Sequence, residues 1–199
     1  MRESRFLPVV GQSQQERADA VRNRRKILDV AARMLAEHGT EVLSLDEVAR
    51  AAGVGVGTVY RRFGDRTGLL LALLDDHERR FQDAFISGPP PLGPGAPPRE
   101  RALAFLHALV DRVVAQEALY VMLERSRKSK AGTGPYLLYH MHLAGLLSEA
   151  RPGLPAAYVA DALLAATGAG LIAYQRRERG MSTEDIKAGL TLLAEAILT

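Results

Sequence analysis

The feature that most constrains the fold is the stretch SLDEVARAAGVGVGTVYRRF at positions 44–63. Ser44 and Glu47 form an S-x-x-E pattern, which predicts a reciprocal capping box at the start of a short helix. Gly53 can take the left-handed backbone conformation that ends a helix without a steric penalty. A second helical pattern follows over residues 56–63. The stretch therefore predicts two short helices joined by a tight glycine turn.

The apolar residues of each predicted helix share one face. In the first helix these residues are Leu45, Val48, Ala49 and Ala52. In the second helix, Val59 and Phe63 are four residues apart and point inward together. The outward arc then consists of Thr58, Tyr60, Arg61 and Arg62. Hydrogen-bond donors of this kind suit DNA phosphates and purine edges; the alternative is that Tyr60 packs inward and the arginines form only a solvated face.

The stretch from about residue 23 to 74 resembles the DNA-binding domain of TetR-family transcriptional regulators. The motifs that carry the resemblance are RRKILDVAARMLAEHG, the turn AAGV, the helix GTVYRRF and the start of another helix at Asp65-Arg66. The resemblance implies that Tyr60 and Arg61 face bases, that Thr58 and Arg62 face the DNA backbone, and that Arg66 holds a phosphate. The full DNA-contacting set that we expect is Ser44, Thr58, Val59, Tyr60, Arg61, Arg62 and Arg66.

The charge distribution agrees with a nucleic-acid partner for the first third of the chain. Residues 1–66 contain 12 Lys and Arg against 9 Asp and Glu, a net charge of +3, whereas residues 67–199 contain 14 of each. The whole net charge of +3 therefore lies in the segment that resembles a DNA-binding domain. The alternative is that these side chains only solvate helix surfaces, because charge balance bears on association and not on fold.

Composition limits the compartment and the chemistry. A chain of 199 residues with 47% hydrophobic content can bury a sizeable core, and the absence of cysteine excludes disulfides and thiolate metal sites. The longest nearly uncharged run, residues 162–174, is shorter than the roughly 18 residues that span a bilayer, and no secretory leader is recognisable. No P-loop, G-x-S-x-G or HExxH pattern is present. We therefore expect a cytoplasmic protein without membrane contact, enzymatic activity, metal or cofactor.

The helical patterns predict an all-α protein of about nine helices in three parts. Residues 1–21 are expected to form a flexible arm, with minor-groove contact as the alternative; residues 22–67 the helix-turn-helix head; and residues 68–199 a helical body for effector binding and dimerisation. Basic residues at the start of the first helix, expected at about Arg22, would oppose its dipole. Asp65 and Ser182 are expected N-caps. The segment Ser87–Arg99, with six prolines, is expected to be an extended connector.

Aromatic and polarisable residues of the body are candidates for an effector site. The set comprises Phe81, Phe85, Phe105, Met122, Tyr136, Tyr139 and His140. Such side chains adapt to apolar or aromatic ligands, but they serve equally well as plain core. His140 and His142 form an HxH pattern; two positions apart on a helix point in opposite directions, so no shared metal ion is expected.

The resemblance implies a homodimeric repressor that binds a palindromic double-stranded operator and is released by a small molecule. A long helix over residues 155–179 and a last helix from Ser182 would form the dimer seam. The expected interface residues are Ala157, Ala160, Leu164, Gly168, Ile186, Leu190, Leu193 and Ile197. Two other classes remain open: an architectural DNA-binding protein without an effector, and a helical small-molecule enzyme or carrier without specific DNA binding.

Overall fold

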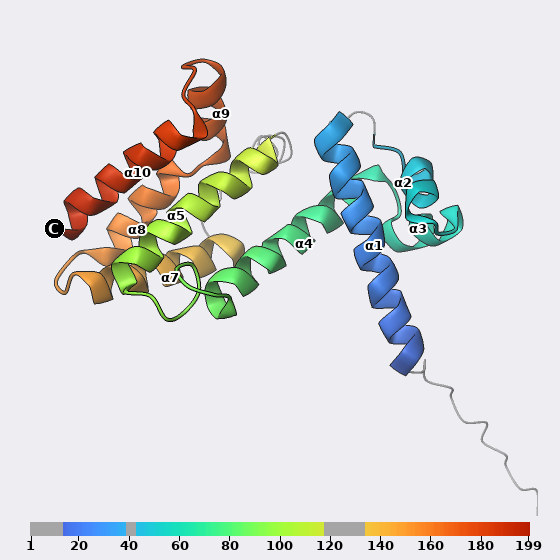
Figure 1. Ribbon diagram of the computed structural model, residues 1–199, viewed down its shortest axis with the longest axis horizontal. Helices are drawn as coiled ribbons and strands as arrows, with labels where there is room; N and C mark the ends of the chain where they lie inside the picture. The colour runs from blue at the N-terminus through green and yellow to red at the C-terminus, as the bar shows by residue number, and fades with distance from the viewer. Residues whose placement is uncertain (1–13, 39–42, 118–133) are drawn as a thin grey trace, which may run out of the picture. The chain divides into compact units, whose positions relative to one another are not determined.

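The computed structural model describes residues 14–38, 43–117 and 134–199. These residues form nine helices and no strand, which confirms the all-α prediction (Figure 1). The chain divides into two compact units, Met1–Leu73 and Leu74–Thr199, which we call the head and the body. Met122, one of the expected effector-site residues, lies outside the described residues.

The head contains α1 (Gln14–His38), α2 (Leu45–Ala52), α3 (Val56–Phe63) and the start of α4 (Arg66–Ser87). Both α1 and α3 pack against α2. Apolar side chains from all four helices fill the core of this unit, among them Ile27, Leu28, Ala31, Val48, Val59 and Leu69. The head is therefore a three-helix cluster closed by the first turns of α4.

The first helix begins earlier than expected. Helix α1 starts at Gln14, so residues 14–21 are helical and the predicted flexible arm of residues 1–21 is wrong over this part. The segment QQERADA contains good helix formers, which propagate a helix that is already anchored downstream. The basic residues from Arg22 onward consequently lie two turns inside the helix. The expected clash with the dipole is wrong, because that effect is confined to the first turn.

Of the two features predicted for the ends of α2, the glycine turn is formed and the capping box is not. Gly53 takes φ 61°, ψ 39°, the left-handed conformation, and its N–H donates back to the end of α2. Ser44 precedes α2 in an extended conformation but makes no side-chain cap bond, so the predicted Ser44–Glu47 capping box is wrong. Glu47 is exposed, and the start of the helix is held instead by the amide of Val48, which donates to the Ser44 carbonyl at 3.0 Å. Acidic side chains in this first turn still favour the helix dipole.

Helix α4 is capped as predicted: the Asp65 carboxylate accepts from the amide of Gly68 at 2.8 Å. The proline-rich segment after it differs from the expected extended connector. It folds into successive turns, with the Gly93 amide donating to the Pro89 carbonyl at 2.9 Å. Gly93 is buried, and a Cβ added there would lie 1.9 Å from the Gly88 carbonyl oxygen. This close approach of two glycines makes the connector compact.

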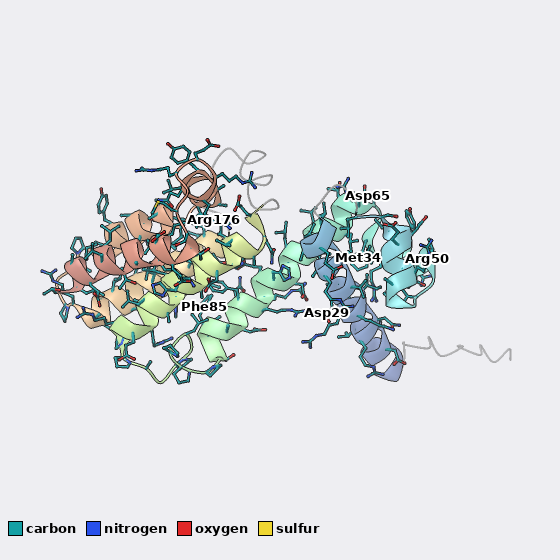
Figure 2. The ribbon with its side chains drawn as sticks, turned by 45° about the horizontal axis from the view of Figure 1, so that its top comes forward. Asp29, Met34, Arg50, Asp65, Phe85 and Arg176 are labelled. Atoms are coloured by element: carbon teal, nitrogen blue, oxygen red, sulfur yellow. The ribbon has the colours of Figure 1, made fainter. Side chains whose placement is uncertain are left out.

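The body contains α5 (Pro98–Ala115), α7 (Gly134–Ala150), α8 (Ala156–Ala166), α9 (Ala169–Arg177) and α10 (Thr183–Leu198). Helix α5 packs against α7, α9 and α10, and α7 also packs against α8 (Figure 1). The core consists of a large apolar cluster from α4, α5, α7, α8 and α10, which includes Phe85 (Figure 2), and a smaller apolar cluster between α5, α9 and α10. At the end of α5, buried Glu117 pairs with Arg177 at 2.6 Å.

The long helix predicted over residues 155–179 is wrong in one respect: it is broken into α8 and α9, with an angle of 43° between them. The Thr167 hydroxyl donates to the Leu164 carbonyl, and Gly168 takes an extended conformation that starts α9. A local side-chain bond and a glycine together account for the break. Within the described residues no single helix is long and apolar enough to cross a membrane; only the bent α8–α9 pair, taken together, meets the length and composition required.

The last helix begins where the sequence predicts. Ser182 accepts from the Asp185 amide at 3.1 Å, and the Asp185 carboxylate accepts from the Ser182 amide at 2.9 Å. Both halves of a capping box are therefore formed at α10.

Candidate functional site

Helix α3 displays its polar residues as the apolar spacing predicts. Val59 is fully buried and Phe63 is 8% exposed, while Tyr60 is 47% exposed and Arg61 is exposed. The inclusion of Val59 among DNA-contacting residues is wrong, because an inward β-branched side chain in the core has no surface to offer a partner. Tyr60 and Arg61 remain available on a helix only eight residues long.

The other candidates of the head take different positions. Thr58 and Ser44 are half-buried, and Arg66 is exposed at the first position of α4. Arg62 is exposed but already engaged: its Nη1 donates to the Ala20 carbonyl of α1 at 2.5 Å. The exposed arc of α3 therefore combines one aromatic and one basic side chain with a second arginine that contacts α1.

The contacts between α1 and the helix-turn-helix were not predicted from the sequence. The Arg24 guanidinium lies 5.8 Å from the centre of the Phe63 ring, and the Lys26 ammonium lies close to Gly53. A signal existed, because Arg24 and Ile27 are three residues apart on α1 and share one side of the helix.

In the body, four of the expected effector-site rings pack against one another. Phe81, Phe85, Phe105 and Tyr139 are all buried, with ring centroids 5.1 to 6.1 Å apart and mostly edge-to-face. We call these four residues the aromatic cluster. They come from α4, α5 and α7 and belong to the core of the body. In this arrangement the four rings fill the space between α4, α5 and α7.

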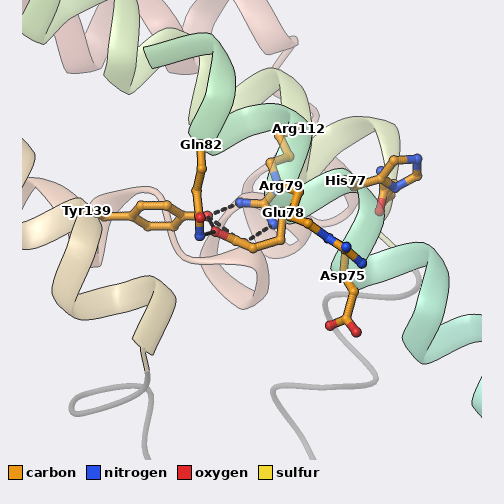
Figure 3. Close-up of polar contacts among 8 residues, drawn as sticks. Asp75, His77, Glu78, Arg79, Gln82, Arg112 and Tyr139 are labelled. Carbon is orange, nitrogen blue, oxygen red and sulfur yellow. Dashed lines mark hydrogen bonds and ion pairs between the residues drawn. The ribbon is translucent and has the colours of Figure 1, made fainter. Parts of the chain in front are cut away.

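Tyr139 links the aromatic cluster to a group of polar side chains that includes Glu78 and Arg112 (Figure 3). The Tyr139 hydroxyl donates to Glu78 at 2.6 Å, and the Arg112 guanidinium contacts both Tyr139 and Glu78, the latter at 2.6 Å. The side chains of Glu78 and Arg112 are 17% and 12% exposed. Burial is the main cause that raises the pKa of Tyr139 well above its usual range, so the phenol stays protonated and can donate. We call Glu78, Arg112 and Tyr139 the polar triad.

The two histidines of α7 point to different surroundings, as their spacing predicts. The His140 Nε2 lies 3.0 Å from the Ala157 carbonyl of α8, whereas the His142 ring lies 4.5 Å from Phe85. Burial, with a smaller contribution from Arg101, lowers the pKa of His142 to about 4. No group of three potential metal-ligating side chains occurs in the described parts of the chain.

The remaining effector candidate, Tyr136, lies at the seam between α7 and α8. Its hydroxyl donates to Asp161 at 2.5 Å, and burial followed by this bond raises the pKa of Tyr136 to about 12. The seven expected effector residues thus divide into a buried cluster, a polar seam with His140, and Met122 outside the described residues.

The expected interface residues also divide. Ala160, Leu164, Ile186 and Leu190 are at most 7% exposed and pack inside the body itself, so they offer no surface to a second copy. Gly168 and Ile197 are half-buried, and only Ala157 and Leu193 are exposed. The prediction that these four residues lie in the dimer interface is therefore wrong. Their regular apolar spacing reflects packing against the core of the same chain. Large exposed apolar side chains on α8 and α10 are Tyr158, Leu192 and Leu193, at 76%, 71% and 54%.

Comparison with known proteins identifies the head. Residues 27–73 match the model of the bacterial regulatory proteins of the tetR family. The head is a TetR-family DNA-binding domain. An HTH-type transcriptional regulator of Staphylococcus aureus (strain bovine RF122 / ET3-1) is 40% identical over 69 residues, which are 35% of this chain and 37% of that protein. The chain therefore matches little more than a third of this relative's length.

Solved structures resemble the chain over most of its length. A Rhodococcus sp. structure described as a TetR-family transcriptional regulator has a TM-score of 0.65 at 23% identity and covers 90% of this chain and 100% of its own. A transcriptional regulator from Saccharomonospora viridis, solved in complex with choline, has a TM-score of 0.67 at 19% identity over 88% and 96% of the two chains. At these identities the likeness shows the fold of head and body together.

Proposed function

We propose that the protein is a cytoplasmic, ligand-responsive transcriptional repressor that binds a palindromic operator as a homodimer. The observation that carries the proposal is the exposed Tyr60–Arg61 pair on α3, held outward by buried Val59 and Phe63 within the TetR-type head. A guanidinium pairs bidentately with guanine O6 and N7 in the major groove, which makes Arg61 the base-reading residue. Arg66, exposed at the start of α4, contacts a phosphate.

DNA binding is tested by gel shift of the full-length protein on a duplex that it selects from a random pool. Arg61→Ala should lose about 1–3 kcal/mol of binding free energy on the selected duplex and little on unrelated DNA. Arg50→Ala is the matched control, because Arg50 is an exposed arginine in the last turn of α2 and not on the reading helix (Figure 2). Equal losses on all duplexes for Arg61→Ala would contradict base reading.

The dimer is proposed on symmetry and on exposed apolar surface. One short reading helix contacts few base pairs, so a two-fold pair with half-sites about 34–36 Å apart gives useful specificity. Tyr158 of α8 and Leu193 of α10 are large, exposed and apolar, and α8 and α10 are in contact. A second copy covering these side chains would remove an unfavourable surface from water.

Sedimentation tests the dimer. The double variant Tyr158→Arg and Leu193→Arg places two charges per subunit in the seam, and we expect monomers with weak operator binding. Leu137→Arg is the control, because Leu137 is half-exposed but lies on α7. A double variant that remains dimeric would place the interface on other helices.

The effector is proposed to be an apolar or aromatic small molecule that binds the body next to the aromatic cluster. The fold likeness to a regulator solved with choline supports a ligand-binding body in proteins of this shape. The polar triad would supply the ligand with hydrogen-bonding or charged groups beside four aromatic rings. A compound that releases operator DNA must bind free protein more tightly than DNA-bound protein, and a 100-fold preference equals about 2.7 kcal/mol of coupling.

Fluorescence titration of each hit against free and operator-bound protein measures this coupling. We expect weaker binding to the operator complex, and Tyr139→Phe should change ligand affinity without changing operator affinity. Hits that bind both forms equally would exclude release by such a ligand.

A further inference from the structure

Helix α1 extends beyond the core of the head. From residue 19 onward, where burial is described, Ile27 is the first buried residue and none of residues 19–26 is buried. Most helical stability in proteins comes from packing of an apolar face, and residues 19–26 of α1 have no buried face. We call residues 14–26 the α1 extension. Polar contacts must therefore decide where it lies.

Those contacts come from the reading helix and from the turn before it. Arg62 of α3 donates to the Ala20 carbonyl at 2.5 Å, and Arg24 lies over the Phe63 ring at 5.8 Å. The Lys26 ammonium lies beside Gly53 of the turn. Arg62 belongs to the exposed arc of α3 and not to its buried face. The α1 extension consequently lies against the Arg62 edge of the exposed arc of α3, next to Arg61 along the helix.

The sequence of the α1 extension is basic. Its sequence contains five Lys and Arg against two Asp and Glu, namely Glu16 and Asp19. Arg22 and Arg25 are exposed, and Arg22 pairs with Asp19. Phosphates border the groove on both sides of any base pairs that a helix reads, and Lys and Arg side chains provide most phosphate contacts.

We infer that the α1 extension is a second DNA-binding element, which contacts backbone phosphates beside the base pairs read by α3, and that Arg62 is the residue that positions it. Arg25 supplies the main phosphate contact and Arg22 a weaker one, because Asp19 offsets its charge. Arg62 acts through Ala20 and not on a phosphate. The inference rests on the proposed DNA binding by α3.

The first test compares two arginines of the same helix. Arg25→Ala and Arg33→Ala remove the same charge from exposed positions of α1, but Arg33 lies outside the α1 extension. Binding of the full-length protein to the selected duplex is followed by fluorescence anisotropy between 50 and 300 mM salt, a range of about 0.8 in log concentration. Arg25→Ala should weaken binding about five- to tenfold and reduce the salt slope by about 1, while Arg33→Ala should leave both unchanged.

The second test is a double-mutant cycle between Arg62 and Arg25. Arg62→Met keeps the aliphatic stem but loses the donation to Ala20. If Arg62 positions the α1 extension, adding Arg25→Ala to Arg62→Met should weaken binding by less than twofold, and the salt slope should fall by about 1 in total. If Arg62 is itself a phosphate ligand, the two losses add and the slope falls by about 2.

The outcomes separate this inference from the proposed function. If Arg25→Ala binds like wild type, the α1 extension does not contact phosphates. If the losses in the double-mutant cycle add, Arg62 does not position the α1 extension. Loss of discrimination in Arg61→Ala would still support base reading by α3 in either case. If Arg61→Ala, Arg25→Ala and Arg33→Ala all bind like wild type, both the inference and the DNA-binding role of α3 fail.

Discussion

The head and the body use their aromatic and arginine side chains in opposite ways. In the head, Tyr60 and Arg61 lie exposed on α3. In the body, Tyr139 and Arg112 are largely withdrawn from water and bond to each other and to Glu78. The same residue types therefore form a surface for a partner in one unit and a closed internal network in the other. The difference teaches that an aromatic or arginine residue indicates a binding site only where the local structure also leaves its side chain exposed.

The largest expected effect tests whether the aromatic cluster is core. Phe105 is fully buried and contacts the other three rings of the cluster. Phe105→Ala should lower the free energy of unfolding of the body by about 3–5 kcal/mol, because it removes a buried ring and leaves a cavity. Chemical denaturation followed by circular dichroism measures this. A loss below about 1 kcal/mol would indicate that Phe105 borders an existing cavity instead.

The next effect tests the closed network. Glu78→Gln keeps the shape of the side chain but removes the charge that pairs with Arg112 at 2.6 Å. We expect a loss of about 1–3 kcal/mol in unfolding free energy, because a mostly buried guanidinium loses its charged partner. Asp76→Asn is the control, since Asp76 pairs with the more exposed Arg80. Equal, small losses for the two variants would show that the polar triad behaves like a surface ion pair.

A smaller effect, confined to acid, tests burial in the body. The pKa of His142 is lowered to about 4 from an unfolded value of 6.5. The unfolded chain binds a proton between these values while the folded chain does not, so stability is full above pH 6.5 and declines as the pH falls toward 4. His142→Leu should reduce the change of unfolding free energy with pH between pH 4 and 6.5. His107→Leu, which removes a histidine bonded to Thr191, should leave the decline in place.

The smallest effects compare one cap in each unit. Ser182→Ala should cost about 1 kcal/mol, because it removes a formed capping box at α10. Ser44→Ala should cost less than about 0.5 kcal/mol, because Ser44 makes no side-chain cap bond at α2. Thermal unfolding of the two variants provides the comparison. Similar losses would contradict the difference between the two helix starts.

Short-range patterns predicted most of the head and the boundaries of several helices. The spacing of Val59 and Phe63, the glycine at position 53 and the caps at Asp65 and Ser182 all depend on residues within one or two turns. The contact from Arg62 to Ala20 joins residues 42 apart and has no local signature. Sequence patterns likewise identified Ile186 and Leu190 as apolar without deciding whether their partner is the same chain or another.

The folded proline-rich segment between α4 and α5 also affects the denatured chain. The five prolines between the two helices have restricted backbone angles before folding begins, so the unfolded ensemble gives up little entropy when the segment closes. Part of the stability of the body therefore originates in the unfolded state and corresponds to no contact in the folded one. Exchange of an exposed proline such as Pro94 for glycine would weaken the body chiefly by enlarging the unfolded ensemble.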